Sequence, residues 1–337
     1  MLYYGGDWLV MGASRLALSL GVSALVVGLT VVSFGTSMPE LMVSISAVFG
    51  GTSDISVGNV IGSNIANIAL ILGVAGLIFP VFVHPILIRR EIPILVVITI
   101  FTAFALSDGI IGQVDGIILL LGLVAFNLLM FYLAVLDRRN DNEPEASKVS
   151  TQVMVAYKEK EELREQVNRP RELGRLLVGL VVLAAGAQAT VTGAVSVART
   201  FGISELVIGV TIVAIGTSLP ELATTVAAAL KKQSDIALGN IVGSNVYNLL
   251  AILGVTAFLR PIPLFQTISF RPYNELLASP ALIDYTTFYQ VTRVDGPVML
   301  GFTLLLIPLA FNKRIGRVEA VILLTLYVLF NAYVILR

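Results

Sequence analysis

The chain has 337 residues, of which 56% are hydrophobic and 13% are charged, with 22 basic and 22 acidic side chains. Soluble domains are about 45–50% apolar and about 25% charged, so a soluble globular fold of this length is excluded. The zero net charge argues against nucleic-acid binding. The absence of cysteine excludes disulfides, thiol catalysis and cysteine-ligated zinc, and a single histidine, His84, excludes a histidine metal cage. An integral membrane protein remains.

Apolar stretches of about 20 residues, the length that crosses a bilayer as a helix, recur along the whole chain. None alternates with the period of two that marks a membrane β-barrel, so each is predicted to be helical. In chain order the predicted spans are 2–20, 24–49, 56–79, 92–107, 112–136, 173–200, 205–230, 237–260, 296–311 and 318–336. The sequence thus predicts an all-α integral membrane protein with ten transmembrane helices.

Two polar segments interrupt this series of spans. Residues 137–172 are rich in charge and are predicted to be a linker between a five-helix half at 1–136 and another at 173–337. Residues 262–293 contain three prolines and are predicted to be a loop at the membrane surface. Neither segment contains a motif that assigns it a function.

The basic residues are distributed unevenly between the two sides of the membrane. With ten spans, both termini lie on one side and the linker lies on the other. Most Lys and Arg residues fall on the linker side, including Arg89, Arg90, Lys231 and Lys232. Because basic loops mark the cytoplasm, we expect a multi-pass protein of the cell membrane with a cytoplasmic linker and both termini outside.

The chain contains an internal repeat. Residues 26–80 align with residues 207–261 without a gap, and about 25 of the 55 positions are identical. Each repeat begins a half with five spans, and because five is odd, the two halves enter the membrane from opposite sides. This pattern predicts two inverted repeats, the architecture of secondary transporters whose substrate site lies near the bilayer midplane on broken helices.

The first repeated motif is Gly-Thr-Ser-x-Pro-Glu, at 35–40 and 216–221. Glu40 and Glu221 are the only carboxylates deep inside the predicted spans, and no Lys or Arg occurs at matching depth. A charge at the bilayer centre costs several kcal/mol unless it is paired, so a bound cation is the natural partner. The proline of the motif lacks an N–H and disturbs the carbonyls one turn earlier, which then become available as cation ligands.

The second repeated motif is Gly-Asn-x-x-Gly-Ser-Asn-x-x-Asn, at 58–67 and 239–248. Its serine and final asparagine are four residues apart and share a helix face, which turns hydroxyl and amide oxygens toward the carboxylates. The small residues are predicted to let helices approach closely, and Asn59 and Asn240 to cap broken backbone. A site built from oxygen alone disfavours zinc, copper and iron and suits Ca²⁺ or several Na⁺ ions.

Through these two motifs, each present twice, the sequence closely resembles the cation/calcium exchanger superfamily, in particular the prokaryotic sodium/calcium exchangers. The resemblance covers nearly the whole chain and implies electrogenic exchange of several Na⁺ for one Ca²⁺ by alternating access, without enzymatic activity or a resident cofactor. It implies that Glu40 and Glu221 bind Ca²⁺ and share Na⁺, with carbonyls from Thr36 and Thr217. The other ligands it implies are Ser37, Ser63, Asn67, Ser218, Ser244, Asn248 and the carbonyls of Ser33 and Ala214.

Some alternatives stay open at this point. Asn248 stands where potassium-dependent relatives have Asp, which argues against a K⁺ requirement. The proton-coupled branch typically has an acidic residue and a His after the Gly-Asn pair, and their absence favours Na⁺. A Ca²⁺/H⁺ antiporter on the same scaffold is the alternative, and a cation channel is a third hypothesis. The expected partners are Ca²⁺, Na⁺ and the lipid bilayer, with no nucleic acid, no indicated protein partner and a monomeric state.

Overall fold

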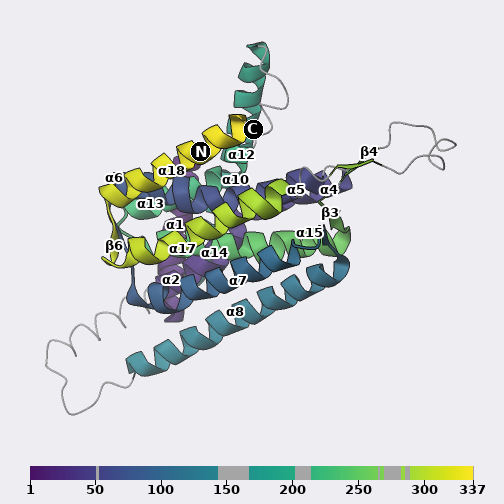
Figure 1. Cartoon of the computed structure of the whole chain (residues 1–337). Helices are drawn as coiled ribbons and strands as arrows, with labels where there is room; N and C mark the ends of the chain where they lie inside the picture. Colours follow the sequence, from purple (N-terminus) through teal and green to yellow (C-terminus); the bar gives the residue numbers. More distant parts are fainter. Residues whose placement is uncertain are drawn as a thin grey trace, which may run out of the picture.

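The computed structural model describes residues 1–50, 53–142, 167–201, 214–264, 266–268, 282–284 and 289–336. Helices dominate these residues, as the apolar stretches predict (Figure 1). Within the described part of the chain, six helices are long and apolar enough to cross a membrane, or seven if one bent pair is counted as a single span. The architecture is that of an all-α protein with several membrane-crossing helices.

The helices before the polar segment closely follow the predicted stretches. They are α1 (Leu2–Leu20), α2 (Ala24–Val27), the π-helical turn η1 (Gly28–Val32), α3 (Ser33–Thr36), α4 (Met38–Phe49), α5 (Ser53–Ala66), the π-helical turn η2 (Asn67–Ile71), α6 (Leu72–Ile78), the π-helical turn η3 (Leu87–Glu91), α7 (Ile92–Ala105) and α8 (Gln113–Asn142). Helix α8 continues six residues beyond its predicted end at 136, because a helix can carry charged residues once it has left the apolar layer.

The helices after the polar segment repeat this order. They are α10 (Arg169–Thr200), α12 (Ala214–Thr217), α13 (Leu219–Leu230), α14 (Ser234–Tyr247), the π-helical turn η5 (Asn248–Ile252), α15 (Leu253–Leu259), the π-helical turn η6 (Val291–Asp295), α17 (Gly296–Ala310) and α18 (Arg317–Leu336). The first part of the predicted span 205–230, up to residue 213, lies outside the described residues, as do 143–166 of the predicted linker and most of 269–288.

Helix breaks occur at both Gly-Thr-Ser-x-Pro-Glu motifs. Helix α3 ends at Thr36 and α4 starts at Met38, and the chain bends by 42° between them. Ser37 and Ser218 adopt almost the same backbone angles at the two breaks (φ −83°, ψ 6° and φ −85°, ψ 7°). The cause is the proline two residues later, which has no N–H for the carbonyl four residues before it.

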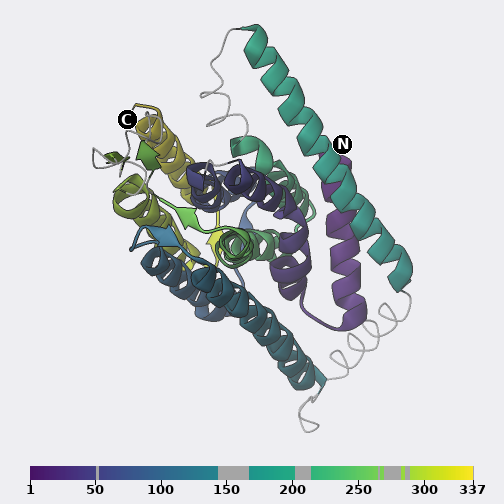
Figure 2. The same ribbon diagram turned by 90° about the vertical axis from the view of Figure 1, so that its right-hand side faces the viewer.

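Helices α1 and α10 form a long antiparallel pair beside the rest of the bundle, and α10 extends beyond the N-terminal end of α1 (Figure 2). Glycines allow the close approach: a Cβ at Gly12 would lie 2.8 Å from the Glu172 carbonyl oxygen, and one at Gly179 would lie 2.7 Å from the Leu9 nitrogen. Glu172 is buried between the two helices, where it pairs with Arg15 (3.0 Å) and with Arg175.

Helix α14 lies at the centre of the molecule, and every residue from Ile236 to Tyr247 in it is buried. Helices α8 and α18 are mostly exposed along their apolar surfaces, as expected for helices that face lipid. Three short antiparallel pairs join the loops: β1 (Val81–Phe82) with β6 (Arg314–Ile315), β2 (Ile110–Ile111) with β3 (Ile262–Pro263), and β4 (Gln266–Ile268) with β5 (Leu282–Asp284). The second motif of each repeat thus lies largely on α5 or α14, in the two candidate spans that are most buried inside the protein.

Candidate cation site

The two motif carboxylates lie in the first turns of α4 and α13. Glu40 and Glu221 are each 1% exposed. The N-terminal end of a helix carries partial positive charge, which favours a carboxylate there. Among the described residues, no basic side-chain nitrogen lies within 4.0 Å of either carboxylate. The structure thus buries two acidic groups and gives neither a basic partner.

Each carboxylate accepts a hydrogen bond from the serine of the opposite repeat. The Ser37 hydroxyl donates to Glu221 Oε1 at 3.2 Å, and the Ser218 hydroxyl donates to Glu40 Oε1 at 3.2 Å. The second oxygen of each carboxylate, Oε2, is buried and has no hydrogen-bond partner in the part of the chain that the structure describes. These contacts cross between the halves, so both breaks face one shared centre.

The other motif hydroxyls extend this centre. The Ser218 and Ser63 hydroxyl oxygens lie 3.5 Å apart. The Thr36 hydroxyl lies 3.4 Å from the Ser244 hydroxyl and donates to Asn240 Oδ1 at 3.1 Å. All of these side chains are buried. The structure therefore brings the hydroxyls of α3, α5, α12–α13 and α14 together around the two carboxylates.

Two asparagines brace the broken helices, as the sequence predicts. Asn59 Nδ2 donates to the Glu40 carbonyl (3.1 Å) and to the Ser44 hydroxyl (3.0 Å). Asn240 makes the equivalent bonds to the Glu221 carbonyl (3.4 Å) and the Thr225 hydroxyl (3.2 Å). These bonds hold the start of α4 against α5, and the start of α13 against α14.

The last asparagine of each second motif pairs with an asparagine of the other half. Asn67 Nδ2 donates to Asn245 Oδ1 at 2.9 Å, and Asn248 Nδ2 donates to Asn64 Oδ1 at 3.1 Å. The Oδ1 atoms of Asn67 and Asn248 are buried and accept no hydrogen bond. Together with the two carboxylate Oε2 atoms, four buried acceptor oxygens in two repeat-related pairs have no donor among the described residues. Buried polar atoms are normally satisfied, so this concentration of acceptors fits a bound cation.

Three further predicted ligands, Ser33, Thr217 and Ala214, lie on α3 and α12, the short helices that precede the two breaks. The Ser33 carbonyl accepts a bond from the Ser37 amide (3.0 Å), and the Thr36 hydroxyl, which donates to Asn240 Oδ1, lies 3.3 Å from it. The Ser33 hydroxyl donates to the Gly28 carbonyl (2.7 Å) and lies 3.0 Å from the Asn240 carbonyl oxygen. Thr217 is buried at the end of α12, and Ala214 begins that helix.

Close backbone packing holds α14 against η1. A Cβ at Gly239 would lie 2.7 Å from the Leu25 carbonyl oxygen and 3.0 Å from the Gly28 Cα. This confirms the predicted close approach for the second repeat. At the equivalent Gly58 and Gly62, no described residue lies within 4 Å of such a Cβ, so the prediction for the first repeat stays open.

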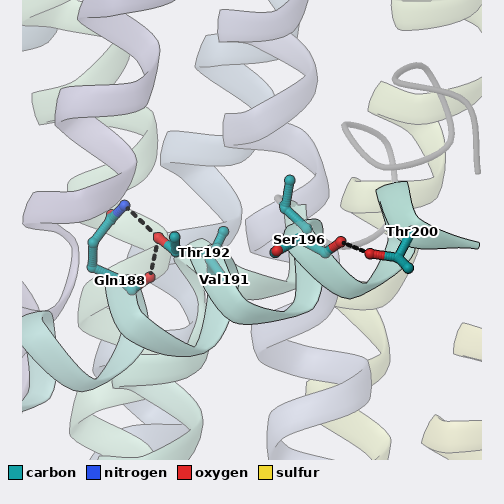
Figure 3. A pocket seen from close by; sticks show the side chains of 6 residues that line it. Gln188, Val191, Thr192, Ser196 and Thr200 are labelled. Atoms are coloured by element: carbon teal, nitrogen blue, oxygen red, sulfur yellow. Dashed lines mark hydrogen bonds between the residues drawn. The ribbon is translucent and has the colours of Figure 1, made fainter.

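A separate pocket of about 790 Å³ lies along the C-terminal half of α10 (Figure 3). Its lining residues are Gln188, Val191, Thr192, Val195, Ser196 and Thr200. Their polar groups bond within the helix: Gln188 donates to the Thr192 hydroxyl (3.3 Å), and Thr200 donates to the Ser196 carbonyl (3.0 Å). Because all six lining side chains are neutral, the pocket offers less to a cation than the carboxylate centre does.

Sequence reasoning missed the direct role of Asn64 and Asn245. Both belong to the repeated Gly-Ser-Asn triplet and are 1% exposed, and they form the partners of Asn67 and Asn248. Their duplication in the motif was a signal, but the helical spacing alone does not show that they meet across the two halves.

Comparison with known proteins decides the family. A model of the sodium/calcium exchanger protein family matches residues 1–132 and 172–336. The chain belongs to this sodium/calcium exchanger family. It is 37% identical to the inner membrane protein YrbG of Escherichia coli over 89% of this chain and 90% of that protein. It is 32% identical to the sodium/calcium exchanger MaX1 of Methanosarcina acetivorans over 89% of this chain and 93% of that protein.

A solved structure of the sodium-calcium exchanger NCX_Mj, soaked with Na⁺ and Ca²⁺, has the same fold. It matches with a TM-score of 0.74 and 31% identity, covering 98% of this chain and 94% of that chain. The expected family and the all-α, multi-pass membrane architecture are therefore confirmed. Members of this exchanger family are transporters, so the chain is a cation/Ca²⁺ antiporter of the prokaryotic type.

Proposed function

We propose that this exchanger moves Ca²⁺ against Na⁺ by alternating access, with the ions bound between the two helix breaks. The observation that carries this proposal is the set of four buried oxygens, from Glu40, Glu221, Asn67 and Asn248, that accept no hydrogen bond from the described residues. Two negative charges balance one Ca²⁺, and the neutral oxygens around them supply the further ligands that Ca²⁺ or several Na⁺ ions take. Thr36, Thr217, Ser37, Ser218, Ser63 and Ser244 complete the proposed ligand set, with carbonyls from Ser33 and Ala214.

The proposed arrangement is two inverted five-helix halves, 1–136 and 173–337, joined by the linker 137–172. Support comes from contacts that recur in both halves at the repeat offset, such as Ser37 with Glu221 and Ser218 with Glu40. The strand pairs add support. Pairing of β1 with β6 joins two loops that the ten-helix count assigns to the linker side, and pairing of β2 with β3 joins two loops assigned to the opposite side.

We place the linker in the cytoplasm and both termini outside, because the basic residues gather on the linker side. The protein is proposed to act in the cell membrane as a monomer, with Ca²⁺ and Na⁺ as its substrates and no resident cofactor. Exchange of three or more Na⁺ for one Ca²⁺ moves net charge, so transport is electrogenic in this proposal. Transport is also proposed to be independent of K⁺, because Asn248 supplies a neutral amide where potassium-dependent relatives have an Asp carboxylate.

The α1–α10 pair is proposed to move against the rest of the bundle during alternating access. This pair contacts the bundle at α13, where a Cβ at Gly6 would lie 2.9 Å from the Ala223 carbonyl oxygen. An ion pair between Asp7 and Lys231 (2.7 Å) joins the same two surfaces. The pair also packs against α2 and shares a cluster of buried apolar residues with α13 and α14, and this packed surface is the one along which sliding is proposed.

Flux measurements in proteoliposomes test the proposal. An outward Na⁺ gradient should drive uptake of ⁴⁵Ca²⁺, and a K⁺ gradient should have no effect. Uptake driven by a pH gradient without Na⁺ would instead establish the Ca²⁺/H⁺ alternative, and single-channel currents would establish a channel. The site assignment is tested by variants in the same assay, where Glu40→Gln and Glu221→Gln should each abolish uptake.

The matched control is Glu319→Gln, since the Glu319 carboxylate accepts a bond from the Gly316 amide (2.9 Å) away from the site. Normal uptake in both site variants would refute the assignment.

A further inference from the structure

Two asparagines that are not among the proposed ligands contact the two that are. Asn245 Oδ1 accepts a hydrogen bond from Asn67 Nδ2, and Asn64 Oδ1 accepts one from Asn248 Nδ2. All four side chains are 1% exposed. An asparagine amide has an acceptor end and a donor end of nearly the same shape, and only the oxygen end can bind a cation. Which end of Asn67 and Asn248 faces the site therefore decides whether they are ligands.

A backbone carbonyl fixes the orientation of the first pair. Asn245 Nδ2 donates to the carbonyl oxygen of Asn64 at 3.3 Å. A carbonyl can only accept, so Asn245 must present its NH₂ group there and its oxygen toward Asn67. Asn67 must then donate a hydrogen bond to that oxygen through its own NH₂ group. Its oxygen is left on the other side of the amide, where it has no protein partner.

A thioether fixes the orientation of the second pair. Asn64 Nδ2 lies 3.5 Å from the sulfur of Met299 in α17, within range for a hydrogen bond to sulfur. A thioether is also an acceptor only, so the Asn64 oxygen faces Asn248. Asn248 therefore donates through its NH₂ group and turns its oxygen away, where it too has no protein partner. The sulfur of Met299 is a weaker acceptor than the Asn64 carbonyl, so the Asn64–Asn248 pair is held less firmly than the Asn245–Asn67 pair.

We propose that Asn64 and Asn245 are positioning residues that set the orientation of the Asn67 and Asn248 amides, so that both turn oxygen toward the transported cation. The inference rests on the proposed function. Without Asn245, the Asn67 amide loses its acceptor and can rotate, and half of its orientations place an NH₂ group against the cation. Removal of groups that orient metal ligands commonly lowers affinity by about 10–100-fold.

A double-mutant cycle tests whether Asn245 acts through Asn67. Asn245→Leu should raise the KM for Ca²⁺ about 10-fold or more in proteoliposomes, with a smaller change in kcat. In an Asn67→Leu background the same change should alter the KM less than about 2-fold, because the amide that it orients is already gone. Equal effects in both backgrounds would show a merely structural role and would overturn the inference.

Further variants separate this result from misfolding. Asn331→Leu is the matched control, because Asn331 donates to the Tyr327 carbonyl on its own helix (2.9 Å), and its KM should equal that of the wild type. Met299→Leu keeps the volume but removes the sulfur acceptor, and it should raise the KM by a smaller factor than Asn245→Leu. Unchanged KM values in both Met299→Leu and Asn245→Leu would overturn the inference. If the wild type shows no cation-driven uptake, the proposed function fails instead.

Discussion

Replacement of Gly239 by alanine tests how closely the two repeats must approach to build the site. The added Cβ would lie 2.7 Å from the Leu25 carbonyl oxygen, 3.0 Å from the Gly28 Cα and 3.0 Å from the Leu29 nitrogen. All three atoms belong to the backbone of α2 and η1, so no side chain can rotate away. Helix α14 must move outward by several tenths of an ångström.

The cost of this movement follows from the neighbouring contacts. Overpacking of a tight interface costs about 1–3 kcal/mol. The shift also strains the contacts of the Ser33 hydroxyl with the carbonyls of Gly239 (3.3 Å) and Asn240 (3.0 Å). Because this hydroxyl has one proton and its nearest acceptor is the Gly28 carbonyl (2.7 Å), the two contacts together are worth at most about 1 kcal/mol. Alanine regains about 1 kcal/mol through its higher helix propensity. We expect a net loss of roughly 1–3 kcal/mol, which for a chain of 337 residues corresponds to a fall in Tm of roughly 1–5 °C.

Thermal unfolding of the purified protein in detergent measures this loss. The matched control is Gly301→Ala, because no neighbouring atom of the described residues lies within 4 Å of a Cβ at that position in α17, and its Tm should stay the same or rise slightly. The Gly239 variant should also transport Ca²⁺ more slowly, since the displaced backbone positions Asn240 and Ser244. A Tm equal to that of the wild type would refute the packing argument.

Two further predictions concern the interface and the topology. In a double-mutant cycle with Asp7→Asn and Lys231→Gln, we expect a coupling free energy of about 0.2–1 kcal/mol in thermal unfolding, because the pair is close but partly exposed; additive effects would show that the two charges do not interact. Because the chain has no cysteine, single cysteines report sidedness directly. In intact cells a membrane-impermeant maleimide should label Ser107→Cys and leave Lys313→Cys unlabelled, and the reverse pattern would invert the proposed topology.

The helix breaks and the buried carboxylates could be predicted from the sequence because each has a local cause. Pro39 and Pro220 remove a backbone donor wherever they occur in a helix, and an acid within an apolar stretch must find a partner. The asparagine braces at 59 and 240 followed from the same reasoning. These features depend on a few neighbouring residues, and the structure confirms their placement.

Other features depend on distant contacts and could not be predicted. The sequence showed that Ser37 and Glu221 are motif residues, but not that the serine of one repeat bonds to the carboxylate of the other. The π-helical turns that begin at Asn67 and Asn248 were also missed, because one extra residue per turn barely changes a pattern of apolar residues. The extension of α8 to Asn142 was missed because charged residues were taken to mark its end.

The crossed bonds between the repeats have a consequence for synthesis. Glu40 depends on the hydroxyl of Ser218, which lies 178 residues later in the chain. At about 5–20 residues per second, the ribosome needs roughly 10–40 s to supply this partner. During that interval the first half is in the bilayer, and Glu40 lacks the hydrogen bond from Ser218. The site can therefore form only after the second repeat has been synthesised, and a first half made alone would lack the donor to its buried acid.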